Sequence, residues 1–109
     1  MAMETKTTLN GESGLTYFFS ISPWECLFQP LGAVYTVLGK DNEIGAFTVL
    51  YIGQTRDLST LFSSHRKKAC LAHYRGSHIG VHIEPDLITR SIIEADLIVN
   101  YKPVCNGPR

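Results

Sequence analysis

The sequence is short of the features that would place it at once in a functional class. It has no formal net charge, because ten lysine and arginine residues are matched by ten aspartate and glutamate residues. The net charge of the protein therefore gives no indication of a nucleic-acid or membrane partner. The longest apolar runs are far shorter than the roughly 20 residues that cross a bilayer. We also expect no secretion leader, since no basic start precedes an apolar stretch.

Cysteine is scarce and irregularly placed. The three residues are Cys26, Cys70 and Cys105, and no C-x-x-C pair occurs. An odd count at such spacings argues against a disulfide framework or a zinc ribbon. We therefore expect three buried or inert thiols and a cytoplasmic location. Histidines do not indicate a metal site either, because His78 and His82 would lie about 13 Å apart along one strand.

What the chain does contain is the pattern of one α+β domain. The runs 33–38 and 47–52 are rich in β-branched and aromatic residues, and a glycine-rich loop joins them, which predicts an antiparallel hairpin. A helix is expected over about 57–75, a third strand over 77–83 and a second helix over about 86–100. The apolar face expected for the second helix consists of Leu87, Ile88, Ile92, Ala95, Ile98 and Val99.

These elements predict a small α+β fold. We expect a three-stranded, mainly antiparallel sheet flanked by helices, in the order β-β-α-β-α. Residues 1–14 are polar and are expected to be a disordered N-terminus, whereas residues 15–109 form a single domain. The aromatic segment before Pro30 is compatible with a short strand and with a turn of helix around Trp24.

Several pieces of the sequence occur in an order that resembles one enzyme superfamily. The tripeptide 33–35 ends in a tyrosine in the first strand, and the tripeptide 51–53 closes the second strand as Tyr-Ile-Gly. Glu94 then opens the pattern E-x-x-L-I-x-x-Y-x-P-x-x-N, which ends at Asn106. Over residues 31–106 the chain resembles the GIY-YIG nuclease superfamily.

This resemblance implies a metal-dependent endonuclease that hydrolyses nucleic acid, DNA more than RNA. Glu94 would hold one Mg²⁺ or Mn²⁺ ion together with several waters. Of Tyr35 and Tyr51, one would orient or deprotonate the attacking water and the other would hold phosphate. His65 would be either a phosphate donor or a packing residue, and Asn106 would fix the local geometry by hydrogen bonds. The implied catalytic residues are therefore Tyr35, Tyr51, His65, Glu94 and Asn106.

One position departs from the family pattern. The family's helix reads D/N-L-x-x-R-x-x-x-H, and the matching residues 57–65 carry Leu61 where the arginine stands. An arginine can bind two phosphate oxygens at once, a geometry that no aliphatic side chain provides. Arg56 is the better candidate for a replacement, because Arg66 would lie about 140° around the helix from Leu61.

A local basic cluster offers a second route to nucleic acid. Residues 58–83 contain no aspartate or glutamate. The candidate nucleic-acid-binding residues are Arg56, Arg66, Lys67, Lys68 and Arg75. Two hypotheses stay open: a slow endonuclease, or a catalytically degenerate domain that binds nucleic acid or another protein. The sequence leaves the oligomeric state open.

Overall fold

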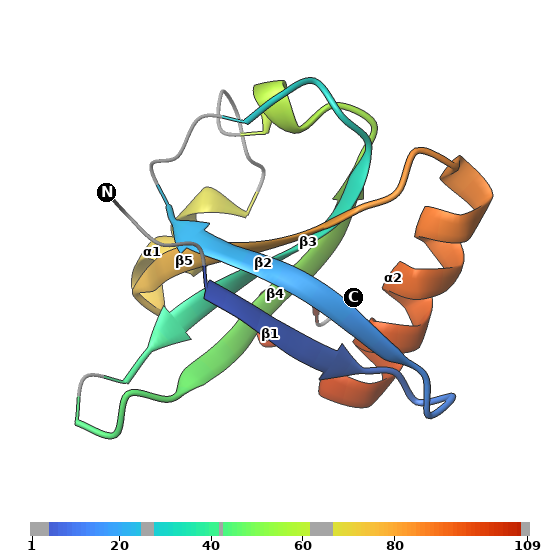
Figure 1. Cartoon of the computed structure of the whole chain (residues 1–109). Coiled ribbons are helices and arrows are strands. Elements are labelled where there is room, and N and C mark those ends of the chain that lie inside the picture. Colours follow the sequence, from blue (N-terminus) through green and yellow to red (C-terminus); the bar gives the residue numbers. More distant parts are fainter. Residues whose placement is uncertain (1–4, 25–27, 42, 62–66, 108–109) are drawn as a thin grey trace.

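The computed structural model describes residues 5–24, 28–41, 43–61 and 67–107. These residues form a five-stranded antiparallel sheet with the strand order β1-β2-β5-β3-β4 (Figure 1). The strands are β1 (Thr5–Asn10), β2 (Thr16–Pro23), β3 (Ala33–Lys40), β4 (Phe47–Thr55) and β5 (Gly76–Ile83). The helical elements are the single turn η1 (Leu58–Thr60), the short α1 (Lys68–His73) and α2 (Leu87–Tyr101). None of the described helices is long and apolar enough to cross a bilayer.

The predicted three-stranded sheet in the order β-β-α-β-α is wrong. The described order is β-β-β-β-α-β-α, because the segment before Pro30 contributes a hairpin of two further strands. The side chains of Tyr17, Phe19 and Ile21 are buried at alternate positions of β2, which is the period of a half-buried strand. A strand, β1, also lies in the stretch 1–14 that was expected to be disordered.

The first predicted helix is also much shorter than expected. In the part of 57–75 that the structure describes, only η1 and the six-residue α1 are helical. Asp57 caps η1 by accepting a hydrogen bond from the Ser59 amide at 2.9 Å, as its N-cap position predicts. Arg75 has a φ of 60°, so the chain leaves α1 through a left-handed residue and enters β5 directly.

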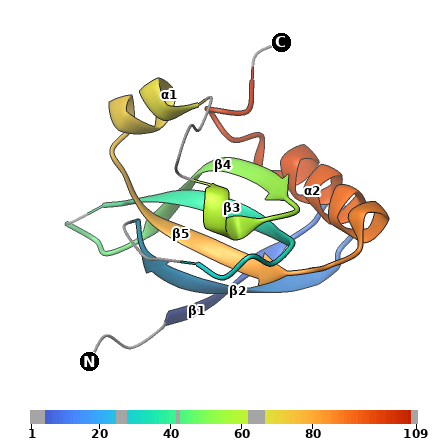
Figure 2. The same cartoon turned by 90° about the horizontal axis from the view of Figure 1, so that it is seen from above.

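Both faces of the sheet are covered, which makes β3 its most buried strand. Leu71 of α1 packs with side chains of β3, β4 and β5 in one core cluster. Ile93 and Leu97 of α2 pack with Val34 and Ile52 in a second cluster on the opposite face. Figure 2 shows the two helices on separate sides of the sheet. Successive side chains of β3 and β4 point to opposite faces of the sheet, so each lies either on the face of the cluster with α1 or on the face of the cluster with α2.

The predicted apolar face of α2 does not pack against the sheet. The buried residues of this helix are Arg90, Ile93 and Leu97, whereas Ile88 and Ile92 are exposed. The prediction is wrong because α2 is apolar on two opposite sides, and periodicity alone does not select the side that faces the core. Of the expected face, Ile98 is the member that packs against the second cluster.

Asp96 fastens the β1–β2 hairpin to α2. Its Oδ1 accepts from the Ser13 amide at 2.8 Å, and its Oδ2 accepts from the hydroxyls of Ser13 at 2.6 Å and Tyr17 at 2.8 Å. Nearby, the Asn100 side chain donates to the Asn10 carbonyl at 2.7 Å. These bonds join residues far apart in the sequence, and they explain how a weakly apolar β1 is held in the sheet.

Acidification is expected to loosen this attachment. Hydrogen bonds from Ser13 hold the pKa of the Asp96 carboxyl below its ordinary value. A depressed folded-state pKa stabilises the fold above the unfolded value near pH 4, and that contribution is lost as pH falls through the folded value. Between about pH 4 and 2, Tm should therefore fall less steeply for Asp96→Asn than for the parent. Circular dichroism melts test this against Glu43→Gln in the β3–β4 turn; equal slopes for the parent and Asp96→Asn would contradict it.

Candidate functional site

Two of the predicted site residues, Tyr35 and Tyr51, lie together. Their ring centroids are 5.9 Å apart, and both rings are buried in the cluster that faces α1. Tyr35 pairs with Gly53 across the β3–β4 ladder. A Cβ atom at Gly53 would lie 2.8 Å from the Tyr35 hydroxyl and 2.8 Å from the Tyr51 ring, so a larger residue would displace the pair. The glycine of the Tyr-Ile-Gly tripeptide is thus explained by the tyrosines that pack over it.

A β-bulge orients Tyr51. The register of β3 and β4 shifts between Val37 and Leu38, which pair with Tyr51 and Val49. Leu50 is the extra residue, and it is buried in the same cluster as Tyr51 although the two are neighbours in sequence. A bulge disrupts the alternation of side chains and re-aims one of them. Here it places Leu50 and Tyr51 on one face, beside Tyr35.

Asn106 binds the backbone next to Tyr51. Its Oδ1 accepts from the Ile52 amide at 2.8 Å, and its Nδ2 donates to the Ile52 carbonyl at 2.7 Å. The Cys105 amide donates to the Leu50 carbonyl at 2.9 Å. The C-terminal segment therefore satisfies the outer backbone groups of β4, an edge strand. Asn106 thus makes hydrogen bonds to the strand backbone, and its role in a catalytic site stays a prediction.

Glu94 reaches the same end of β4 from α2. The Gln54 amide donates to the Glu94 carboxylate at 3.4 Å and to the Ser91 hydroxyl at 2.8 Å. Gln54 directly follows Gly53, the glycine over which the two tyrosines pack. The Glu94 carboxylate is therefore bound one residue further along β4 than this glycine. Because neighbouring strand residues point to opposite faces, the β4 backbone lies between the Gln54 side chain and the tyrosine rings. Glu94 and the tyrosines thus approach the C-terminal end of β4 from its two faces.

Arg90 is the site residue that the sequence did not reveal. Its guanidinium is buried, and it donates to the Gln54 side-chain oxygen at 3.0 Å and to the carbonyls of Glu84 and Pro85 at 3.1 and 2.8 Å. A Cβ atom on Gly32 would meet this guanidinium at 2.5 Å. Glu94 follows Arg90 by four residues, a spacing that is common for an exposed pair on a helix. The sequence feature that could have indicated burial is the position of Arg90 on the side of α2 that carries Ile93 and Leu97.

The arginine position of the family pattern is part of the core. Leu61 is half-buried and packs against the cluster that contains Tyr35 and Tyr51. Its amide donates to the Leu58 carbonyl at 3.2 Å, at the end of η1. His65, the other predicted residue of this segment, lies outside the described residues. The substitution of leucine for arginine therefore places an apolar group against the tyrosine cluster.

The predicted basic residues do not gather in one patch. Arg56 follows the C-terminal end of β4, whereas Arg75 lies beside Gly39 and the β3–β4 turn. The two ends are about 20 Å apart along β3 at the rise of a strand. Lys67 and Lys68 lie at the start of α1, and Arg66 is outside the described residues.

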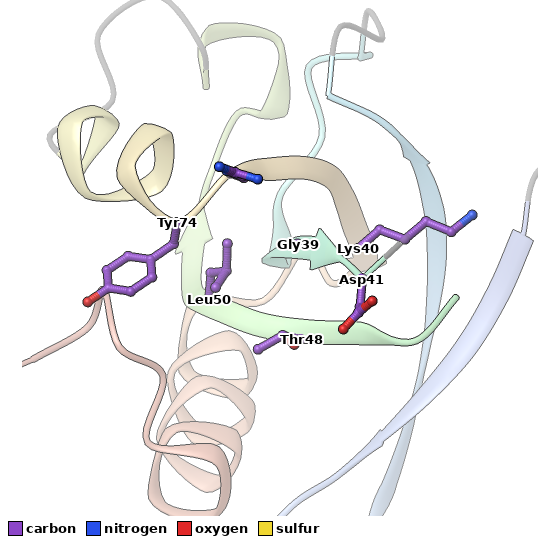
Figure 3. Close-up of a pocket in the computed structure, with 7 residues that line it drawn as sticks. Gly39, Lys40, Asp41, Thr48, Leu50 and Tyr74 are labelled. Carbon is purple, nitrogen blue, oxygen red and sulfur yellow. The ribbon is translucent and has the colours of Figure 1, made fainter. Parts of the chain in front are cut away.

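A shallow cavity of about 270 Å³ lies toward the turn between β3 and β4, and Leu50, the neighbour of Tyr51, is part of its lining (Figure 3). Its lining includes Lys40, Asp41, Thr48 and Tyr74. The Asp41 carboxylate accepts from the Glu43 amide at 2.9 Å, which commits it to the turn. The residues of β3 that line the cavity are Gly39 and Lys40, at the end of the strand opposite Ala33, so the cavity lies away from Gly53 and Glu94.

Metal binding at the site would depend on one carboxylate. The described residues contain no group of three or more His, Cys, Asp or Glu side chains that could hold an ion. Mg²⁺ usually keeps several waters and needs only one or two carboxylates. Glu94 is half-buried and could supply one such carboxylate, and it also accepts from the Gln54 amide at 3.4 Å. The site suits a largely hydrated Mg²⁺ or Mn²⁺ ion and no tightly caged metal.

Two of the cysteines are not the inert thiols that were expected. Cys70 of α1 and Cys105 form a disulfide with a Cα–Cα distance of 5.8 Å. The expectation of three free thiols is wrong because residues 35 positions apart meet in the fold, which spacing does not reveal. The bridge ties the residue before Asn106 to the helix that covers the tyrosine cluster.

No protein-family model, curated protein or solved structure matches this chain. The resemblance to the GIY-YIG superfamily therefore rests on the sequence pattern alone.

Proposed function

We propose that the chain is a GIY-YIG-like endonuclease that hydrolyses phosphodiester bonds of DNA, slowly, with Mg²⁺ or Mn²⁺. The proposal is supported by Tyr35 and Tyr51, which lie over Gly53 on one face of β4. Glu94 approaches the same strand end from the other face, and Asn106 binds the β4 backbone there.

The roles follow from position and chemistry. A metal ion bound at Glu94 would neutralise charge on the phosphate and the leaving oxygen. Tyr35 and Tyr51 are buried on the face of β4 opposite Glu94, so they would have to hold a phosphate oxygen or orient water through their hydroxyl groups at the strand end. Asn106 acts through the Ile52 backbone, so it is a positioning residue for Tyr51. Without an arginine at position 61, we expect the rate to be about two to three orders of magnitude below that of an arginine-containing site.

A second candidate function is binding to nucleic acid without cleavage. Two observations favour it: Leu61 packs in the core, and Gln54 is fixed by the buried Arg90 beside Glu94. In this alternative the residues of the pattern serve the fold, and the exposed cations at Arg56 and Lys68 would contact phosphate.

Replacing Glu94 with glutamine is expected to reduce cleavage at least about 100-fold, because the amide keeps the shape of the carboxylate and removes its charge. Labelled single- and double-stranded DNA and RNA are incubated with Mg²⁺ or Mn²⁺, and products are separated on denaturing gels. Glu43→Gln is the matched control, since it removes the same charge from the remote β3–β4 turn.

The outcome separates the two functions. Cleavage by the parent and by Glu43→Gln that is absent in Glu94→Gln supports the endonuclease. Salt-sensitive binding by the parent without cleavage supports the binding module. Cleavage that persists unchanged in Glu94→Gln would exclude Glu94 as the metal ligand and overturn the proposal.

The cytoplasmic location expected from the cysteine pattern is opposed by the Cys70–Cys105 disulfide. Disulfides persist mainly in oxidising compartments such as the periplasm or the cell exterior. The disulfide would remain oxidised in such a compartment, so we expect the protein to work under oxidising conditions.

A further inference from the structure

The outer side of α2 carries a continuous apolar stripe. It consists of Ile88, Ile92, Ala95 and Val99, and the exposed fractions of Ile88, Ile92 and Val99 are 69%, 62% and 53%. The helix lies at the margin of the molecule, with its opposite side on the sheet (Figures 1 and 2). Apolar residues on both sides of a helix indicate that both sides are covered. The sheet covers one side, so the stripe is the candidate for a second contact.

We propose that two copies of this chain associate through this stripe, with their α2 helices antiparallel across a twofold axis. The stripe residues are separated by four, three and four positions, which is the spacing of a helix–helix seam. A twofold contact uses the same patch on both copies, so the patch must be complementary to itself. Its midpoint falls between Ile92 and Ala95, so an antiparallel arrangement places each Ile92 against the small side chain of the other copy's Ala95.

The charges at the ends of the stripe favour this arrangement. Asp86 caps the N-terminal end of α2, and Lys102 follows its C-terminal end; both are exposed. Antiparallel packing brings the acidic end of one helix to the basic end of the other and opposes their dipoles, whereas parallel packing would bring like ends together.

The rim of the stripe argues against other occupants. Ser91 and Thr89 flank the stripe, and Lys102 is the one basic residue of the described chain at its edge. A helix that lies on a membrane surface usually carries several lysines or arginines on its polar face. Nucleic acid likewise requires a basic surface. An apolar seam that is bordered by Asp96 and carries no basic residue along its length therefore fits a second helix of the same kind best.

The area of the stripe determines how tightly the two copies are expected to bind. With the neighbouring Leu87, which is 60% exposed, it presents on the order of 500 Å² of apolar surface, within the upper range for the largest patch on a monomer. Two copies with their rims would bury about 1,200 Å² in total, the lower limit of stable interfaces. We therefore expect a dimer with a Kd in the micromolar range.

Sedimentation velocity of the full chain from about 1 to 300 μM tests this. The parent is expected to change from monomer to dimer across that range, and Ile92→Glu is expected to stay monomeric at 300 μM with an unchanged circular dichroism spectrum. The matched control is Phe18→Glu, because Phe18 is equally exposed at 69% but lies on β2. It should dimerise like the parent. Ile88→Lys carries the same test if Ile92→Glu does not fold.

Three results would overturn the proposal. The first is a parent that stays monomeric at 300 μM, and the second is a dimer that survives both stripe substitutions. The third is loss of the dimer in Phe18→Glu as well. Flotation with vesicles of phosphatidylcholine and phosphatidylserine is run in parallel. Binding of a monomeric parent that Ile92→Glu abolishes would assign the stripe to a membrane surface, which also contradicts the proposal.

Discussion

Replacing Leu61 with arginine is expected to raise the rate of DNA cleavage by about 100- to 1,000-fold. An arginine at this position can donate two parallel hydrogen bonds to a phosphate, which leucine cannot. Leu61 already packs against the cluster that holds Tyr35 and Tyr51, so the new side chain starts beside the tyrosines. Single-turnover cleavage of a labelled duplex in Mg²⁺ measures the change directly.

Two further variants at position 61 make this test specific. Leu61→Met keeps an apolar side chain of similar volume and should cleave at the parent rate. Leu61→Lys adds the charge without the bidentate geometry and should recover only part of the gain. A folded Leu61→Arg that binds DNA and still does not cleave it would show that more than the arginine is missing. That result would favour the binding module over the endonuclease.

The sequence predicted the pairing of β3 with β4 but not the rest of the sheet. Tyr35 and Tyr51 lie on these two paired strands, and Asn106 bonds to the backbone of β4 from the C-terminal segment. The two tyrosines meet because their strands are neighbours in the sheet. Asn106 binds β4 because the outer backbone groups of this edge strand need partners.

The parts that were mispredicted depend on contacts between distant segments. The β1–β2 hairpin has few apolar residues in its first strand and is held by Asp96 of α2, which no local pattern announces. The packing side of α2 was misassigned because the helix is apolar on two sides, and the side that packs on the sheet also carries Arg90. Arg90 is compatible with the interior only because Gln54 and two carbonyls satisfy its donors. The sequence alone does not show which groups will accept the hydrogen bonds of a buried arginine.

The Cys70–Cys105 disulfide is a further long-range contact, and breaking it is expected to have the largest effect on stability. It closes a loop of 35 residues, for which the chain-entropy relation gives about 4 kcal/mol. For a domain of this size we expect Tm to fall by roughly 20 °C in Cys105→Ser or after reduction. Circular dichroism melts with and without dithiothreitol measure the shift, and Cys26→Ser is the control because the bridge joins the other two cysteines.

The same change should reach the candidate site before the domain unfolds. The Cys105 amide bonds to Leu50, and Asn106 bonds to Ile52, so the bridge holds the segment that supports the backbone on both sides of Tyr51. Well below the melting temperature, reduced protein should therefore exchange the Ile52 amide hydrogen faster than oxidised protein, while amides of β3 stay protected. Equal Tm values and equal exchange in both states would mean that the bridge does not form in the protein. Lower stability with an unchanged Ile52 amide would instead separate the bridge from the site and leave Asn106 to hold Tyr51 alone.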